Sequence, residues 1–235
     1  MGLYVYCLGD ELGASALEGL TGVGGARVRV LALGALAALV SEAGDGATVA
    51  DEENLLAHNR VNAAALAVST PLPCRFGTRI APERLADYLS TNAAALAAAL
   101  ARVRGCVEMS VKVMETPEGR KAAVQSEAGG SVEVAAGAGT AFLLKKRREI
   151  LGEEGTRRRA EAAEAWLASG VGELARETVA RLSPPEAIFV RAAHLVERPH
   201  VADYRARLRS LAAARKEFRL LTSGPWPPYS FSDLG

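Results

Sequence analysis

The sequence predicts an α+β protein built from two domains and an extended C-terminal tail. Segments with the two-residue alternation of β-strands are interspersed with segments whose apolar residues repeat at helical spacing. The order of these segments divides into two groups near Gly105. The last residues carry prolines that exclude both a helix and a central strand. Together these observations favour two α+β units and a separate tail.

The first group begins with three strand-like segments and a helix. Residues 3–8, 27–30 and 35–41 are apolar or alternating and predict strands. Asp51 suits a helix N-cap, and two glutamates follow it in the first turn, where the helix dipole favours negative charge. Leucine, valine and alanine at helical spacing extend this helix to Val68.

A connection and a second helix complete the first group. Residues 70–78 contain two prolines, which confine them to an edge strand or an extended connection. Pro82 stands where a first-turn proline belongs. Leucines then repeat at helical spacing, so one helix is predicted from Pro82 to Val103.

The second group begins with the clearest strand of the chain, residues 107–113. Residues 116–139 are rich in Gly, Ala and Glu without periodicity and predict a long mobile loop. A helical stretch is then expected over residues 141–182, with breaks near Gly152–Gly155 and Gly170. A strand over 186–196, a helix opened by Pro199 and His200, and a strand over 218–222 follow.

The order of the second group, β-α-β-α-β, has the rhythm of a ferredoxin-like domain with an inserted loop and a long helix. We therefore expect an N-terminal α+β domain over residues 1–103 and a modified ferredoxin-like domain over 104–222. The tail then covers 223–235. A single larger sheet is the alternative.

Composition limits the classes of function. The chain has 235 residues, of which 49% are hydrophobic and 23% charged, which is compatible with a packed core. The net charge of +1 gives no sign of a nucleic-acid or membrane partner. The N-terminus lacks the features of a signal peptide, and no apolar run is long enough for a membrane span. Cys7, Cys74 and Cys106 are far apart, which favours buried thiols in a reduced, cytoplasmic protein.

No motif for catalysis, cofactor binding or metal binding is recognisable. The histidines His58, His194 and His200 fall on separate elements without metal-ligand spacing, and each is interpreted as structural. The chain contains no nucleophile elbow, Walker A motif or dinucleotide fingerprint. We expect no catalytic residue, no cofactor and no metal.

Two basic runs, 145–148 and 157–159, superficially resemble a nucleic-acid patch. Glutamates are interleaved with them at helical i,i+4 spacing, which is typical of a solvated, salt-bridged helix face. The expected pairs are Lys145–Glu149, Glu153–Arg157, Glu154–Arg158 and Arg157–Glu161. The last helix carries a modest basic face that suits an acidic protein surface.

Arg75, Phe76 and Gly77 form an unusual segment just before a predicted helix. A planar guanidinium beside an aromatic ring can bind a carboxylate or stack on a ring. The alternative is an arginine that ties the loop to a neighbouring carbonyl or glutamate, with Phe76 in the core.

The tail combines three aromatic rings with a stiff backbone. Trp226, Tyr229 and Phe231 stand among Pro225, Pro227 and Pro228, directly after Gly224. Prolines fix φ and restrict the residues before them, so the tail is stiff and extended. Its rings must be buried against the protein's own body or against a partner. The first alternative has Trp226 and Tyr229 filling a groove, with the space between the two domains as one location.

Three segments together resemble the GvpF/GvpL family of gas vesicle proteins. Residues 71–78 (PLPCRFGT) resemble the family's PLRFGT segment, and residues 102–113 resemble its L-x-G-x-x-E-x-x-V-K strand. Residues 222–231 resemble its C-terminal TGPWPPYSF, with Ser223 as an additional residue. Residues 3–6 (LYVY) also fit.

The resemblance implies a non-enzymatic accessory or minor structural protein of gas vesicles, made in the cytoplasm. Family members contact the small hydrophobic shell protein, and the resemblance therefore implies the shell protein and other gas vesicle accessory proteins as partners. It also implies a role in nucleating or assembling the shell. It supplies no catalytic site.

Two other classes of function stay open from the residues alone. One is a ligand-binding or enzymatic ferredoxin-like protein that uses Arg75 and Arg79 to hold an anionic metabolite. The other is nucleic-acid binding through the basic helices, against which the net charge argues.

Overall fold

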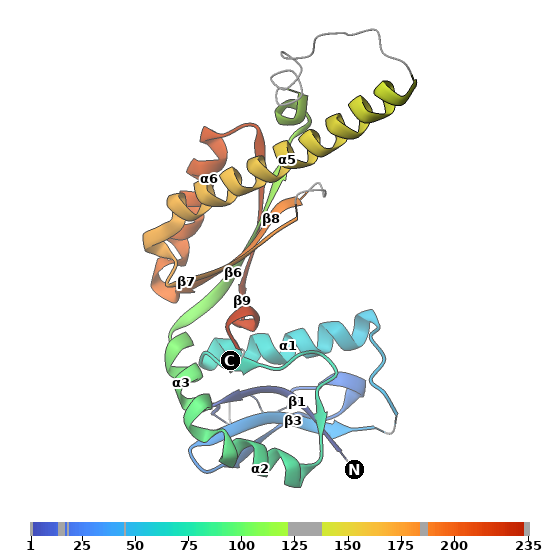
Figure 1. Ribbon diagram of the computed structural model, residues 1–235. Helices are drawn as coiled ribbons and strands as arrows, with labels where there is room; N and C mark the ends of the chain where they lie inside the picture. Colours follow the sequence, from blue (N-terminus) through green and yellow to red (C-terminus); the bar gives the residue numbers. More distant parts are fainter. Residues whose placement is uncertain are drawn as a thin grey trace. The chain divides into compact units, whose positions relative to one another are not determined.

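The computed structural model of the chain describes residues 2–13, 17, 19–44, 46–121, 138–183 and 188–232, with only the helical backbone for 138–152. Helices and strands are mixed throughout the described residues (Figure 1). They group into two compact units. Unit 1 comprises residues 1–108 and 224–235, and unit 2 comprises residues 109–223.

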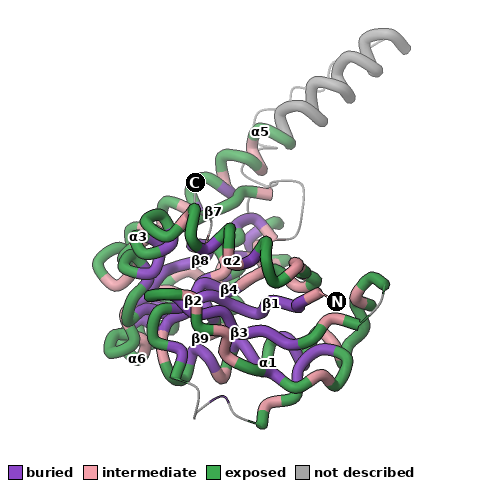
Figure 2. Tube along the Cα trace, turned by 90° about the horizontal axis from the view of Figure 1, so that it is seen from below, coloured by how far each residue is buried: buried purple, intermediate pink, exposed green. Residues whose placement is uncertain are grey.

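Unit 1 is built on a five-stranded sheet. In chain order its strands are β1 (Gly2–Gly9), β2 (Arg29–Leu33), β3 (Leu36–Ala43), β4 (Leu72–Pro73) and β5 (Arg79–Ile80). The main path is β2-β3-β1-β4, with β5 also pairing with β1, and the strands pair antiparallel. β1 and β3 are buried almost throughout, so this strand pair forms the centre of the unit (Figure 2).

Three helices complete unit 1. α1 (Glu52–Val68) lies on one face of the sheet and α2 (Pro82–Thr91) on the other, and α3 (Ala93–Val103) follows α2 (Figure 1). The predicted N-cap of α1 is confirmed, because the Asp51 carboxylate accepts a hydrogen bond from the Asn54 amide at 2.8 Å. The expected single helix over 82–103 is two helices. Asn92 separates them, and its side-chain amide donates to the carbonyl of Tyr88 at 2.8 Å.

Unit 2 contains a four-stranded sheet with the order β7-β8-β6-β9. The strands are β6 (Cys106–Glu115, which begins in unit 1), β7 (Glu177–Leu182), β8 (Ile188–Glu197) and β9 (Phe218–Trp226, which ends in unit 1). Two long helices accompany them, α5 (Ala138–Val171) and α6 (Val201–Ala214). The sheets of the two units are separate in the described residues, so the alternative of one larger sheet is wrong.

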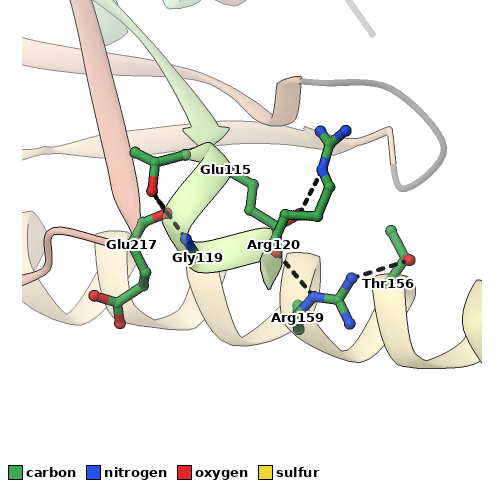
Figure 3. Close-up of polar contacts among 7 residues, drawn as sticks. Glu115, Gly119, Arg120, Thr156, Arg159 and Glu217 are labelled. Atoms are coloured by element: carbon green, nitrogen blue, oxygen red, sulfur yellow. Dashed lines mark hydrogen bonds and ion pairs between the residues drawn. The ribbon is translucent and has the colours of Figure 1, made fainter. Parts of the chain in front are cut away.

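Both helices of unit 2 cover the same face of its sheet. The Trp166 ring on α5 stacks on Phe218 of β9 with centroids 5.6 Å apart, and Tyr204 on α6 contacts His194 of β8. The Glu115 carboxylate of β6 forms ion pairs with Arg159 of α5 at 3.0 Å and with Arg120 at 3.5 Å (Figure 3). The Glu115 side chain is only 4% exposed, so these two arginines neutralise a buried carboxylate and fix α5 to the sheet.

The helix predicted over 141–182 differs from the structure in two ways. α5 continues through Gly152–Gly155 without a break and ends beside Gly170. Residues 177–182 are not helical but form β7, which pairs antiparallel with β8. Five of the six residues of β7 are exposed, so the strand lacks the one-sided burial that produces an alternating sequence.

Two further segments depart from the sequence prediction. The predicted loop 116–139 contains a helical turn at 117–121, and its residues 122–137 lie outside the described part of the chain. The last strand does not end at Thr222 but continues through Pro225 to Trp226. β9 is an edge strand, where a proline without an N–H is tolerated. Short 3-10 turns occupy Val23–Gly25, Gly172–Leu174, Arg198–His200 and Tyr229–Phe231.

Candidate functional site

The candidate site lies within unit 1, where the tail returns to the body of the protein. Its centre is the imidazole of His58 on α1, which is 3% exposed. Three side chains place polar atoms against this ring, namely Tyr4, Asn62 and Tyr229, and we call these four residues the His58 network. They come from β1, α1 and the tail, so the network joins segments that are distant in the sequence.

The Nδ1 side of His58 is anchored by β1 and the loop after β4. The Tyr4 hydroxyl lies 3.0 Å from Nδ1 and accepts a hydrogen bond from the Gly77 amide, also at 3.0 Å. Gly77 has φ of +85°, a conformation that side-chain-bearing residues rarely adopt. The Phe76 ring meets His58 edge to face with centroids 5.6 Å apart. This arrangement explains why an aromatic residue and a glycine are adjacent in this loop.

The Nε2 side of His58 faces the tail. The Asn62 side-chain nitrogen lies 3.1 Å from Nε2, and the Tyr229 hydroxyl lies 3.2 Å from it. With the Asn62 amide in this orientation, Nε2 accepts hydrogen bonds and Nδ1 carries the proton of the neutral ring. The contact between the Tyr229 hydroxyl and Nε2 links the tail to α1.

Burial keeps this network uncharged. Desolvation lowers the pKa of His58 to about 4, although a hydrogen bond to the Cys74 backbone opposes the shift. Desolvation also raises the pKa of Tyr229 and of Tyr4. A neutral imidazole held between two protonated phenols in a buried position suits a structural hydrogen-bond junction.

A second set of contacts holds the tail to β6 and α3. The Glu108 carboxylate accepts the Ser230 amide at 2.7 Å and the Ser230 hydroxyl at 3.0 Å, one bond on each oxygen. The Arg102 guanidinium donates to the carbonyl of Phe231. Glu108 is 7% exposed, and burial raises its pKa even though the bonds from Ser230 oppose the shift. A buried carboxylate with two donors from one residue fixes the position of the tail backbone.

The tail is buried unevenly along its length. Pro227 and Pro228 are buried, Tyr229 is half-buried and Phe231 is 2% exposed. Trp226 is 45% exposed. The expectation that the tail packs on the protein's own body is confirmed for Tyr229 and Phe231. Trp226, the last residue of β9, does not fill a groove as expected, because nearly half of its surface faces solvent.

The arginines proposed for an anionic ligand lie elsewhere in unit 1. Arg75 is exposed, and its carbonyl accepts bonds from both the amide and the hydroxyl of Thr78. Arg79 lines a small surface pocket of about 180 Å³, where its guanidinium donates to the carbonyl of Gly44. The structure thus places the two side chains in different settings and gives no shared anion site.

The remaining candidates are also structural in character. Cys7 and Cys106 are buried and Cys74 is half-buried, and burial raises the pKa of the Cys74 thiol to about 12. Desolvation lowers the pKa of the buried His194 to about 4, whereas His200 is about half exposed. Among the described residues, no group of three His, Cys, Asp or Glu is arranged to hold a metal ion.

Part of the predicted charge pattern on α5 is observed. Arg157 and Glu161 pair at 3.0 Å, and Glu154 and Arg158 pair at 3.8 Å. The Lys145–Glu149 pair lies where side chains are not described. Within the described segments, no helix has the length and apolar character needed to cross a membrane.

Sequence reasoning recognised the tail but not its anchors. Arg102 and Glu108 fall inside the segment that resembles the family's strand motif, and Tyr4 falls inside the resembling N-terminal segment. The signal was therefore present as a shared motif, without the information that these segments meet. His58 and Asn62 gave no signal beyond an i,i+4 polar pair on a helix face.

Comparison with known proteins agrees with the sequence resemblance. The profile of the family described as "Gas vesicle synthesis protein GvpL/GvpF" matches residues 2–233. Gas vesicle protein L2 of Halobacterium salinarum is 27% identical over 98% of this chain and 91% of that protein. Gas vesicle protein F of Streptomyces sp. is 32% identical over 98% of this chain and 99% of that protein.

Solved structures show the same fold. The crystal structure of GvpF from Anabaena sp. PCC7120 matches with a TM-score of 0.81, covering 99% of this chain and 96% of that chain at 19% identity. GvpF from Microcystis aeruginosa matches with a TM-score of 0.80 and covers 99% of both chains, again at 19% identity. The family match spans nearly the whole sequence, and the chain belongs to the GvpL/GvpF family of gas vesicle synthesis proteins.

Proposed function

We propose that this chain is a non-enzymatic accessory or minor structural protein of gas vesicles. It binds the small hydrophobic shell protein in the cytoplasm and supports nucleation or assembly of the vesicle wall, together with other gas vesicle accessory proteins. Membership of the GvpL/GvpF family is the observation that carries this proposal. The polar cluster around His58 supports it, because the cluster holds the tail in place and presents no accessible nucleophile or base.

The strand order supports a ferredoxin-like assignment for unit 2. The order β7-β8-β6-β9 combined with the element order β-α-β-β-α-β is that of a ferredoxin-like sheet. α5, at 34 residues, is the enlarged element of this arrangement. We assign the remaining α+β unit and the docked tail to the N-terminal domain.

We assign different roles to the two ends of the tail. Residues from Pro227 to Phe231 act as a structural motif that closes unit 1, with Phe76 and Gly77 supporting the same network. Trp226, at the end of β9 and after Gly224 and Pro225, presents a large aromatic surface to a partner. An exposed indole suits the apolar surface of a shell protein.

No specific observation favours the alternative of an enzyme acting on an anionic metabolite. Arg79 uses its guanidinium on a backbone carbonyl of its own chain, and Arg75 belongs to a tight turn with Thr78. Neither arrangement provides a concave site with convergent cations.

Co-purification with the shell protein tests the proposal. The full chain is expected to retain the shell protein, and Trp226→Ala is expected to lose most of that retention while its melting temperature changes little. Tyr88→Ala is the matched control, because Tyr88 is an aromatic residue of similar exposure, 41%, on α2. If the unaltered chain fails to retain the shell protein under conditions where another gas vesicle accessory protein does, the proposed function is wrong.

A further inference from the structure

Within the described residues, no strand pairs with the outer edge of β7 in unit 2. It is the outermost strand of its sheet, and five of its six residues are exposed. The Ser183 amide donates to the Phe189 carbonyl at 3.0 Å, which sets the odd-numbered residues of the strand to bond with β8. The amides and carbonyls of Thr178, Ala180 and Leu182 therefore point away from β8, as a template for another strand.

The other sheet edges of the chain are less suited to pairing with a copy of themselves. β9 contains Pro225, which lacks a donor, beside Gly224. β2 has Arg29 as its only charged residue, so pairing with itself brings no opposite charges together. β7 has neither proline nor glycine, and it carries one acid and one base, Glu177 and Arg181.

The charges of β7 are complementary to the same strand running in the opposite direction. A two-fold axis through Val179 places Glu177 of each copy opposite Arg181 of the other. It also places Val179 opposite its own copy. In this register Thr178 of each copy lies opposite Ala180 of the other. The backbone amides and carbonyls of these residues point away from β8, so they form the hydrogen-bonded pairs that the antiparallel pattern requires. The charged pairs then fall at non-hydrogen-bonded positions, where facing side chains are closest.

The neighbouring registers are less favourable. The register between the two β7 strands can shift only if Thr178, Ala180 and Leu182 stay in hydrogen-bonded positions. Each allowed shift therefore moves the two-fold axis by one residue along the strand. An axis through Ala180 places Arg181 opposite Val179, which leaves the charges unmatched. The next step places Arg181 opposite its own copy, and like charges directly opposite each other are destabilising.

We propose that two copies of this chain associate through antiparallel pairing of their β7 strands, with Glu177 and Arg181 setting the register. The two sheets then continue into one another across the two-fold axis. A six-residue strand pair buries less than the roughly 1,200 Å² typical of stable complexes, so the association is weak and concentration-dependent. It is also strongest at low ionic strength, because the charged pairs are exposed to solvent.

Sedimentation of the full chain over a range of concentrations at low salt tests this proposal. The unaltered chain is expected to show reversible dimerisation. Glu177→Arg and Arg181→Glu each place like charges opposite one another twice, and each is expected to weaken dimerisation roughly tenfold or more. The melting temperatures of both variants are measured alongside, so that a loss of association is distinguished from a less stable fold.

Mixing the two variants provides the decisive comparison. In a mixed dimer, a chain with arginine at both positions faces a chain with glutamate at both, so every pair is attractive. The mixture is expected to dimerise although neither variant does so alone. The double variant Glu177→Arg/Arg181→Glu is likewise expected to regain self-association.

A backbone variant tests the strand pairing separately from the charges. Ala180→Pro removes an outward-pointing N–H and leaves the odd-numbered amides that bond with β8. It is expected to abolish dimerisation while the circular dichroism spectrum is retained. The proposal is overturned if the unaltered chain stays monomeric at all concentrations, or if the mixed variants fail to associate. It is also overturned if Ala180→Pro loses only retention of the shell protein, because the edge then serves that partner.

Discussion

At the scale of single residues, two buried histidines determine how the protein responds to acid. His58 and His194 are 3% and 0% exposed, and desolvation lowers the pKa of each to about 4. His194 contacts Tyr204, and its Nε2 has no hydrogen-bond partner among the described residues. Both rings are therefore neutral in the folded state at neutral pH, and charging either one is unfavourable.

Stability is expected to fall between about pH 6.5 and 4. In this window the unfolded chain binds a proton at each histidine and the folded chain does not, so the contribution is complete above pH 6.5 and is lost towards pH 4. A shift of this size corresponds to on the order of 3 kcal/mol for each histidine. Urea unfolding at a series of pH values measures it.

Two histidine variants separate this effect from the protonation of carboxylates. His194→Gln is expected to reduce the pH dependence over this window. His200→Gln, at an exposed histidine, is expected to keep the dependence of the unaltered chain. An unchanged pH dependence in His194→Gln contradicts the assignment.

The carboxylate of Glu108 is expected to contribute more to tail docking than the residue it binds. Glu108→Ala removes the acceptor of both the amide and the hydroxyl of Ser230, and each hydrogen bond lost costs about 0.5–1.5 kcal/mol because Ser230 is exposed to water. Ser230→Ala removes only one of the two bonds and is expected to cost less. Thermal unfolding of both single variants and of the double variant measures the coupling. Additive effects show that the two side chains do not act together.

At the scale of elements, the tail is a strap whose packed part and exposed part are adjacent. Phe231 is fully enclosed, and its carbonyl is held by Arg102. Trp226 lies five residues earlier, at the end of β9, with 45% of its surface exposed. The strap therefore divides into a buried segment that stabilises unit 1 and a residue that is about half exposed.

Substitutions at these two rings are expected to differ strongly in stability. Phe231→Ala removes a buried ring and is expected to cost about 3–5 kcal/mol. Trp226→Ala is expected to cost less, because nearly half of the indole already faces solvent. Calorimetric melting of the two variants makes the comparison. Equal losses show that Trp226 is as much a part of the core as Phe231.

At the scale of the whole molecule, unit 1 is completed by a distant part of the chain. Residues 1–108 and 224–235 form one compact unit, although the whole of unit 2 separates them in sequence. The first unit is therefore incomplete until the last segment has been made and docked.

The tail is expected to bind unit 1 even when it is supplied as a separate peptide. A chain truncated after Trp226 loses the contacts of Tyr229, Ser230 and Phe231 and is expected to melt at a lower temperature. A peptide of residues 227–235 is expected to raise the melting temperature again as its concentration increases, because it binds the folded state alone. The same peptide with Phe231→Ala serves as the control. Equal effects of both peptides exclude specific docking.

The sequence by itself determined the elements whose pattern is strong. Apolar runs predicted the strands β1 and β3, which are buried on both faces, and two-residue alternation predicted β6. The acidic N-cap predicted the start of α1, and the prolines predicted an extended backbone in the tail. The motifs of residues 71–78, 102–113 and 222–231 were sufficient to identify the family.

The tertiary structure decided what the local pattern does not encode. β7 was invisible because an edge strand exposed on both faces carries no alternation, and its pairing with β8 is what makes it a strand. The junction of Tyr4, Asn62 and Tyr229 at His58 depends on contacts between residues up to 171 positions apart. Sequence determines which residues are available for such a junction. Only packing determines that they meet, because long-range contacts depend on the whole chain rather than on any local period.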